Sequence, residues 1–463
     1  MTDSLSPADE VAERGLGAAR GGECVVIIED ASEVEVRFAN NTTTTNGTRR
    51  NRRVTVVRFL DRPGGVTTGV ASASGAVDID NLVAAAEERA RAAVEIADDA
   101  SPLVDGGVDA GLDEPAAIVS PDAVAGVVTG LADAFGRARA EHRVLAGFAT
   151  TELSTCLLAA SSGTRRRHVQ PTGSLQLVGR TPDGTRSAWA GFASAALTAS
   201  DLARLDARIT ARLATAERRI ELPAGRYEVL LPPDAVADLM IVLGDAASGR
   251  DAHDGRSVFS SPGGRTRIDD AIAPLPFRLE SDPRRPGIEC IPFLAATSSG
   301  TDVSVFDDGS PIGACRWIEG GRLERLRYHR VGAERASQPF TPPVDNLALD
   351  LPGATDSLDD LIARTERGLL LTCLWYIREV DVSTLLLTGL TRDGVYLVEN
   401  GEVVGSVNNF RFNESPVDLL ARAVEAGRSE RALSREWGEW MNRTIMPALR
   451  VEGFNMSSVS PAN

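Results

Sequence analysis

The pattern of hydrophobic and polar positions divides the chain into two parts of different texture. In the first part, β-branched or alternating runs predict strands, and apolar residues at a spacing of three and four predict helices. The strands are expected at residues 23–29, 33–38, 54–59, 143–158 and 173–191, and the helices at 78–97, 121–140 and 199–217. Helices and strands intermixed in this way predict an α/β or α+β domain.

A polar stretch, residues 40–53, separates two of the predicted strands. It contains Asn46-Gly47, a pair typical of the type I′ turn of a hairpin. Arg49, Arg50, Arg52 and Arg53 form the basic cluster of this stretch. We interpret the cluster as part of a solvated loop or edge strand, although four arginines could also grip an anion or an acidic partner.

The second part begins after Pro223, where short apolar runs alternate with turn residues. Such a pattern predicts a mostly antiparallel arrangement of strands. Turns are predicted at Asp308-Gly309, Gly320-Gly321, Asp393-Gly394 and Asn400-Gly401, and a late helix at residues 415–426. We therefore expect an α+β protein of two domains, an N-terminal α/β domain over residues 1–220 and a mostly antiparallel β domain over residues 221–463.

Composition narrows the possible functions. The length of 463 residues suits two or three domains, and the net charge of −16 disfavours binding to nucleic acid. All 49 basic residues are arginine, which excludes a Schiff-base lysine and a P-loop lysine. The five cysteines form no CxxC pair, and no secretory signal or membrane-spanning apolar run is visible. We expect a cytoplasmic protein that does not bind a membrane.

Candidate metal ligands are few. His253 lies in the run Asp251-Ala252-His253-Asp254, which could bind a divalent metal ion, but an exposed polar loop with a capping aspartate is the favoured interpretation. Cys373 lies in an apolar run and is expected to pack in a core. Trp437 and Trp440 are likewise expected to close a core.

Residues 227–245 predict a strand that leads through a proline turn into a short helix. Val236, Leu239, Met240 and Leu243 are spaced at i, i+3, i+4 and i+7, which predicts a face directed toward a core. The window holds no histidine, and no glutamate after Glu228. The helix itself therefore offers no imidazole or glutamate for metal chemistry.

Residues 389–415, GLTRDGVYLVENGEVVGSVNNFRFNES, combine two tight turns with short strands. This segment resembles the C-terminal signature of the TldD/PmbA family. A strand–helix at 227–245, the turn Gly255-Arg256-Ser257 and the closing run at 446–451 are similar as well. The signature positions are Arg392, Asp393, Gly394, Glu399, Asn400, Gly401, Asn413 and Glu414.

The resemblance implies a particular place within that family. Its zinc peptidases carry HExxxH on the strand–helix that matches residues 227–245, where two imidazoles hold zinc and the glutamate activates water. Leu239, Met240 and Gly244 stand at the matching positions. The chain is therefore identified as a member of the metal-less PmbA/TldE-like branch, with no catalytic residue and no cofactor of its own.

The resemblance also implies a function, in which two related chains enclose a common cavity. Chains of the two branches associate as a heterodimer, in which a TldD-like HExxxH subunit holds zinc and cleaves an unfolded peptide. The family has also been described as modulating DNA gyrase. The first hypothesis is thus a non-catalytic peptidase subunit. The alternatives are a hydrolase with a divergent metal site at Asp251, His253 and Asp254, and a stand-alone peptide-binding homodimer.

Overall fold

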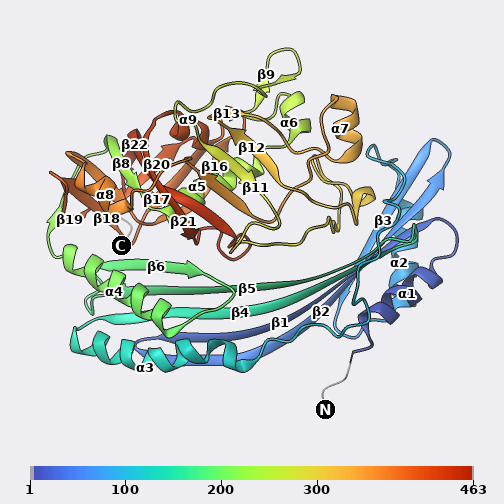
Figure 1. Ribbon diagram of the computed structural model, residues 1–463, viewed down its shortest axis with the longest axis horizontal. Helices are drawn as coiled ribbons and strands as arrows, with labels where there is room; N and C mark the ends of the chain where they lie inside the picture. Colours follow the sequence, from blue (N-terminus) through green and yellow to red (C-terminus); the bar gives the residue numbers. More distant parts are fainter. Residues whose placement is uncertain (1–4, 461–463) are drawn as a thin grey trace.

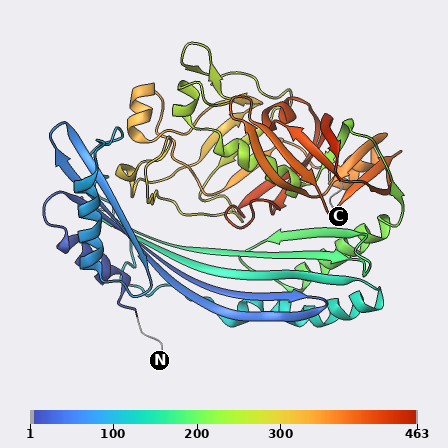
Figure 2. The same ribbon diagram turned by 180° about the vertical axis from the view of Figure 1, so that it is seen from behind.

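The protein has two layers in the computed structural model, which describes residues 5–460. A long curved sheet with helices on its outer face forms one layer, and a strand-rich body lies against its inner face (Figures 1 and 2). Residues 1–4 and 461–463, at the ends of the two predicted domain ranges, lie outside the described residues.

The first sheet has six strands in the order β3-β2-β1-β4-β5-β6, and every neighbouring pair is antiparallel. The sequence predicts either an α/β or an α+β first domain. An antiparallel sheet covered by helices is α+β, so the second of these two predictions describes the first layer. The strands are β1 (Glu23–Ala39), β2 (Thr42–Arg62), β3 (Gly65–Ser74), β4 (Val144–Ala160), β5 (Arg165–Arg180) and β6 (Ser187–Ala193).

The predicted break between residues 29 and 33 does not occur, because β1 is one continuous strand. Asp30 lies in the middle of it and is buried beside Arg52 of β2, with both carboxylate oxygens 2.7 Å from guanidinium nitrogens. The ion pair lets a charged residue remain inside the ladder. Arg52 is thus buried, whereas the other three arginines of the cluster are exposed on β2 as predicted.

The predicted turn at Asn46-Gly47 is wrong, because both residues lie inside β2 and pair with β1. The turn lies at Asn40-Asn41, where φ is 53° and 57°, as a type I′ turn requires. The Asn41 side chain accepts from the Leu145 amide and donates to the Arg143 carbonyl, which ties the turn to β4.

Four amphipathic helices cover the outer face of the first sheet. Val26 and Ile28 of β1 pack under one pair of helices, and Val34, Val36 and Phe38 pack under the other pair at the opposite end. The helices are α1 (Ala8–Ala18), α2 (Ile79–Ala92), α3 (Ala125–Ala140, preceded by the 3-10 turn η1, Pro121–Val124) and α4 (Ala199–Thr215). The three helices predicted from periodicity are thus present, with α2 ending five residues early.

The second layer is a larger, mostly antiparallel sheet with a buried helix, α5 (Pro233–Asp245). Its path runs β13-β12-β11-β14-β22-β8-β15-β18-β19-β7, and β16, β17, β20 and β21 branch from it. The path strands are β7 (Arg219–Ile220), β8 (Gly225–Leu231), β11 (Arg278–Ser281), β12 (Cys315–Glu319), β13 (Arg322–Leu323), β14 (Leu347–Asp350), β15 (Arg367–Leu371), β18 (Val395–Glu399), β19 (Glu402–Val407) and β22 (Thr444–Val459).

The remaining elements of the second layer lie off this path. They are β9 (Ser260–Ser261), β10 (Arg265–Thr266), β16 (Leu374–Asp381), β17 (Leu386–Thr391), β20 (Phe410–Glu414), β21 (Ala423–Ala432), α6 (Gly249–His253), α7 (Arg330–Ala336), α8 (Leu358–Ala363), α9 (Pro416–Ala421) and the 3-10 turn η2 (Val305–Asp307). The predicted turns at Gly320-Gly321 and Asn400-Gly401 close the hairpins β12–β13 and β18–β19. The helix predicted at 415–426 stops at Ala421, because β21 pairs with β22 from Ala423 onward.

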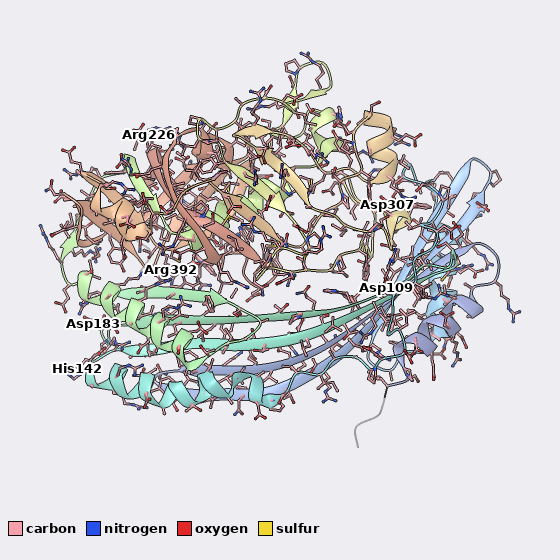
Figure 3. All side chains as sticks on the ribbon, viewed as in Figure 1. Asp109, His142, Asp183, Arg226, Asp307 and Arg392 are labelled. Carbon is pink, nitrogen blue, oxygen red and sulfur yellow. The ribbon has the colours of Figure 1, made fainter. Side chains whose placement is uncertain are left out.

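The two layers are joined at both ends of the first sheet. At one end, Val25 and Ile27 of β1 share a core with Phe293, Leu294 and Phe306. At the other end, Trp189 and Ala193 of β6 pack on Cys373 and Leu433. Figure 3 shows Asp109 and Asp307 on the two sides of the first junction. Arg166 connects these sides, because its guanidinium pairs with Asp109 and donates to the Gly309 carbonyl.

The mixed α+β class with mostly antiparallel sheets is therefore confirmed. Within residues 5–460, no helix combines the length and the apolar character needed to cross a membrane.

Candidate functional site

A stripe of polar residues crosses the inner face of the first sheet between the two junctions. Glu29, Cys156 and His168 lie opposite one another on β1, β4 and β5. Ser154 with Gln170, and Glu152 with Thr172, continue the stripe along the strands. Because side chains alternate along a strand, the intervening apolar residues face the outer helices. The glutamates of the alternating β1 sequence therefore point between the layers.

This stripe forms the floor of a cavity of about 540 Å³ between the two layers. The opposite wall comes from the second layer and includes Asp245, Arg327, Asp345, Trp440 and Arg443. Arg443 spans the cavity edge, since its guanidinium pairs with Asp345 and donates to Thr172 Oγ1 at 3.1 Å. The lining combines polar and apolar side chains, and a pocket of this size can hold a small ligand or a short peptide segment.

The floor of the interlayer cavity is poorly suited to nucleophilic chemistry. Burial raises the pKa of the Cys156 thiol, which keeps it protonated. Burial also lowers the pKa of His168, whose Nε2 lies 3.1 Å from Gln170 Oε1. The pKa of Glu152 is raised by burial and then by the neighbouring Glu33. The arrangement offers hydrogen-bonding groups rather than an activated nucleophile.

The helix that the family motif would occupy, α5, packs in the core of the second layer. Val236, Leu239, Met240 and Leu243 are all buried there, as their spacing predicts. Gly244 lies against Leu347, and a Cβ at this position would stand 3.5 Å from that side chain. Leucine, methionine and glycine provide no atom that binds zinc or transfers a proton, so the positions do not fit a catalytic zinc.

Sequence reasoning missed Asp238, which lies on α5 and is completely buried. Its Oδ1 accepts hydrogen bonds from the Ser434 hydroxyl at 2.5 Å and the Glu436 amide at 2.9 Å. Its backbone carbonyl accepts from the Trp437 indole. Burial raises the pKa of Asp238 to about 8. One feature of the sequence could have indicated this buried carboxyl group. Asp234 and Asp238 are spaced at i and i+4, so they lie on the same face of a mostly apolar helix.

Asp238 anchors residues 433–441, the segment that carries the two tryptophans. Trp437 is partly buried on the core of the second layer, whereas 49% of Trp440 is exposed. The prediction that both close a core is therefore wrong for Trp440. Its ring forms a wall between the interlayer cavity and an apolar cavity of about 320 Å³ lined by Val242, Ile377 and Leu387.

The residues of the predicted alternative metal site are bound to neighbours. His253, on α6, has Nδ1 2.9 Å from the Gly264 carbonyl and Nε2 3.1 Å from the Tyr328 hydroxyl. Asp251 accepts from Thr301, and both Asp251 and Asp254 pair with Arg256. Across residues 5–460, no three His, Cys, Asp or Glu side chains are grouped to hold a metal ion.

Cys373 lies between β15 and β16 in the junction with Trp189, and burial raises the pKa of its thiol. It packs as predicted. Next to this junction, the Arg435 guanidinium stacks on Trp375 with its central carbon 4.0 Å from the ring centre. The junction thus combines apolar packing with an aromatic–cation contact.

The signature residues are dispersed around the second layer. Asn400 and Gly401 form the β18–β19 turn, where Gly401 has φ 81° and a Cβ would stand 2.6 Å from the Ala363 carbonyl. Gly394 approaches Thr372 so closely that a Cβ would lie 2.1 Å from its hydroxyl. These glycines are required by close backbone approach.

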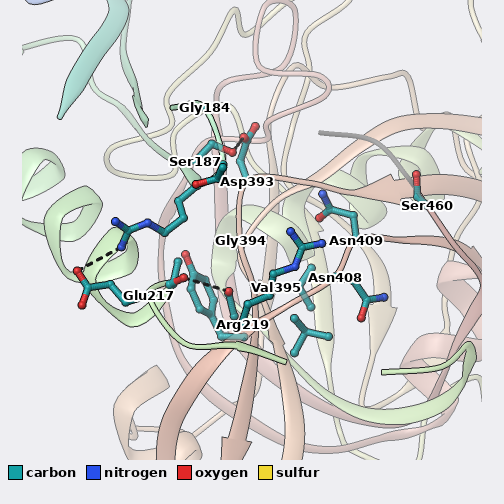
Figure 4. A pocket seen from close by; sticks show the side chains of 16 residues that line it. Gly184, Ser187, Glu217, Arg219, Asp393, Gly394, Val395, Asn408, Asn409 and Ser460 are labelled. Atoms are coloured by element: carbon teal, nitrogen blue, oxygen red, sulfur yellow. Dashed lines mark hydrogen bonds and ion pairs between the residues drawn. The ribbon is translucent and has the colours of Figure 1, made fainter. Parts of the chain in front are cut away.

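The charged signature residues make structural contacts. Glu414 is buried, accepts from the Asn455 amide and pairs with Arg422. Glu399 lies 3.7 Å from Arg367, and Asn413 lies in the β17–β20 ladder. Asp393 accepts from Ser187 of the first sheet, and Arg392 lies beside the boundary between the layers (Figures 3 and 4). None of the eight signature residues lines the interlayer cavity.

Comparison with known proteins agrees with this architecture. Residues 224–458 match the family described as the PmbA/TldA metallopeptidase C-terminal domain, and this segment is slightly more than half of the chain. None of the curated proteins matches.

Among solved structures, the chain is similar to TldE from Thermococcus kodakarensis, with a TM-score of 0.76 and 17% identity over 97% of this chain and 99% of that one. It is also similar to a proposed modulator of a DNA gyrase from Thermotoga maritima, with a TM-score of 0.74 and 18% identity over 96% and 99% of the two chains. A proposed modulator of DNA gyrase from Bacteroides thetaiotaomicron has a TM-score of 0.74 and 14% identity over 98% and 100%. At these identities the likeness shows a common fold. Together with the match over residues 224–458, it shows that the chain belongs to the PmbA/TldD family.

Proposed function

We propose that this chain is the non-catalytic, PmbA/TldE-like subunit of a heterodimeric zinc metallopeptidase that processes unfolded peptides. The observation that carries the proposal is the helix α5, where Leu239, Met240 and Gly244 replace the residues that would hold and use zinc. In this proposal zinc and the catalytic glutamate belong to a TldD-like HExxxH subunit.

The interlayer cavity supports a role in holding peptide. Its floor presents amide, hydroxyl, imidazole and carboxyl groups, which can bond to the backbone of an extended chain. The floor lies between the two junctions, in a cavity of about 540 Å³ that is much smaller than a folded domain. Selection by chain flexibility follows from this limit on size.

The strand β16 supports association with a second subunit. Among the described strands, β16 pairs with β17 alone, so no strand covers its other edge, and the Tyr376 amide of β16 donates to Glu436 Oε2 at 2.8 Å. Tyr376, Val380 and Val382 lie on or just after this strand, and about half of each side chain is exposed. An edge that no strand covers and that carries apolar side chains favours pairing with another chain. The same edge would serve a second copy of this chain if the protein works as a homodimer.

The divergent metal site at Asp251, His253 and Asp254 has no observation in its favour, because neighbouring groups bind these side chains. Testing it requires the metal content of the purified chain. Stoichiometric zinc that disappears in His253→Ala would support this alternative over the subunit proposal.

The test of the proposed function is reconstitution. This chain and a TldD-like HExxxH protein would be purified separately and together, and cleavage of β-casein would be followed by the appearance of new amino groups. We expect no cleavage by this chain, cleavage by the pair, and loss of cleavage when the glutamate of the partner's HExxxH is replaced by glutamine.

Two results would contradict the proposal. Chelator-sensitive cleavage by this chain alone would assign the chemistry to it. A homodimer that binds casein but does not associate with the HExxxH protein would instead support the stand-alone peptide-binding alternative. Size-exclusion chromatography with light scattering distinguishes these assemblies.

A further inference from the structure

A third cavity, of about 500 Å³, lies at one end of the molecule and shares no lining residue with the interlayer cavity. It is formed where the turn between β5 and β6 of the first layer meets β18 and the end of β19. Figure 4 shows Gly184 and Ser187 on one side and Arg219, Val395 and Asn408 on the other. We refer to it as the end pocket.

Asn408 lines the end pocket with an amide whose orientation is determined by the fold. Its Oδ1 accepts a hydrogen bond from the Leu222 amide at 2.7 Å, so its Nδ2 must point elsewhere. Only 5% of Asn408 is exposed, and Nδ2 has no hydrogen-bond acceptor within residues 5–460. A buried N–H donor without a partner is costly and rare in folded proteins.

Tyr396 adds a second buried donor to the lining of the same pocket. It is 2% exposed, and its hydroxyl also has no partner in the described part of the chain. Burial raises the pKa of Tyr396 to about 12, so the hydroxyl keeps its proton near neutral pH. Two buried donors that lack acceptors in one pocket indicate that a ligand supplies the acceptor.

The charges around the end pocket favour an anionic acceptor. Arg186 and Arg219 both line it, and their acidic partners, Glu217 and Glu221, are largely exposed. Exposed ion pairs are weak, so these guanidinium groups can exchange their partners for a ligand.

The lining contains two acidic side chains, Asp393 and Glu217, and both already have partners. The Asp393 carboxylate accepts from the Ser187 hydroxyl and lies 3.8 Å from Arg392. Glu217 is held by Arg186 at the rim. Arg219, in contrast, pairs with Glu221, which lies outside the pocket lining.

We propose that the end pocket binds a small molecule or peptide end through a carboxylate group. Asn408 Nδ2 and the Tyr396 hydroxyl donate to the carboxylate oxygens, and Arg219 supplies the compensating charge. A carboxylate is suited to this set because it only accepts hydrogen bonds and carries the opposite charge. This site is independent of the proposed peptidase role.

Isothermal titration calorimetry on the full chain tests the carboxylate assignment. The probes are Ala-Ala-Ala with a free C-terminus, the same peptide with a C-terminal amide, citrate and inorganic phosphate. We expect the free tripeptide or citrate to bind, and which of the two binds identifies the source of the carboxylate. The amide should bind about tenfold more weakly than the acid, because it loses a charge-assisted hydrogen bond.

Variants connect binding to the named side chains. Tyr396→Phe and Arg219→Gln should each weaken binding of the carboxylate about tenfold. Arg367→Gln is the matched control, because Arg367 is as exposed as Arg219, also faces a glutamate, and lies outside the pocket. Without ligand, Tyr396→Phe should unfold at the same or a higher temperature, since its hydroxyl loses no partner.

The proposal is overturned if no carboxylate binds at millimolar concentration, if the amide binds as tightly as the acid, or if phosphate binds more tightly than both carboxylates. Unchanged affinity in Tyr396→Phe, or a lower unfolding temperature of that variant without ligand, would also contradict it. Each of these results can occur whether or not the chain assists a peptidase.

Discussion

The buried carboxyl group of Asp238 should make the stability of this protein fall as pH rises. The pKa of this group is raised from 3.8 to about 8 by burial, with a smaller effect from Asp234 and Glu436. The folded state therefore holds a proton that the unfolded state has already released between these values. Stability from this group is complete below pH 3.8 and is lost as pH rises toward 8.

The substitution Asp238→Asn isolates this effect. Asparagine keeps the Oδ1 acceptor for Ser434 and Glu436, and its neutral amide resembles the protonated carboxyl group. The free energy of unfolding of the variant, relative to the native chain, should increase by about 1.4 kcal/mol for each pH unit between pH 5 and 8. The shift of about four pKa units limits the total gain to roughly 6 kcal/mol.

Urea unfolding between pH 5 and 9 measures this difference. Asp381→Asn is the control, because hydrogen bonds from Thr384 and Ser383 lower the pKa of Asp381 and keep it ionised in both states over this range. A difference between Asp238→Asn and the native chain that does not change with pH would refute the reasoning. So would an equal slope in the control.

Three further substitutions and one control variant test packing in different parts of the fold, each by urea unfolding at pH 7. Arg52→Ala leaves a buried carboxylate without its partner and should cost about 3–5 kcal/mol. Arg49→Ala, an exposed arginine on the same strand, should cost less than about 1 kcal/mol, and equal costs would contradict the assignment. Arg435→Met removes the stack on Trp375 and should cost about 1–2 kcal/mol. Leu239→Ala should cost about 2–5 kcal/mol, whereas a neutral result would mean that α5 is not packed in the core.

The location of the end pocket bears on how the two layers stay together. The same region contains the contact between Ser187 of the first sheet and Asp393 of the signature turn. A ligand in the end pocket would touch both layers, because the lining includes Arg186 from the first and Asn408 from the second. Binding there would be expected to stabilise the junction between the layers.

Local features of the chain were predictable from the sequence alone. The turn at Asn400-Gly401 and the buried face of α5 depend on residues close in sequence, and both are present as predicted. Turn chemistry and helical periodicity act over a few residues, so they can be read without the rest of the fold. The missing zinc ligands at Leu239 and Gly244 are also a property of the sequence itself.

Only the tertiary structure determined whether each face of the first sheet meets solvent, the helices or the second layer. The alternation in β1 predicts two different faces, but it cannot say whether Glu29 meets water or the second layer. The turn between β1 and β2 lies at Asn40-Asn41 because pairing across the whole ladder outweighs the local preference of Asn46-Gly47. The cavities likewise bring together residues far apart in sequence, such as Glu29 with Arg443, and only the packing of one layer on the other determines such distances.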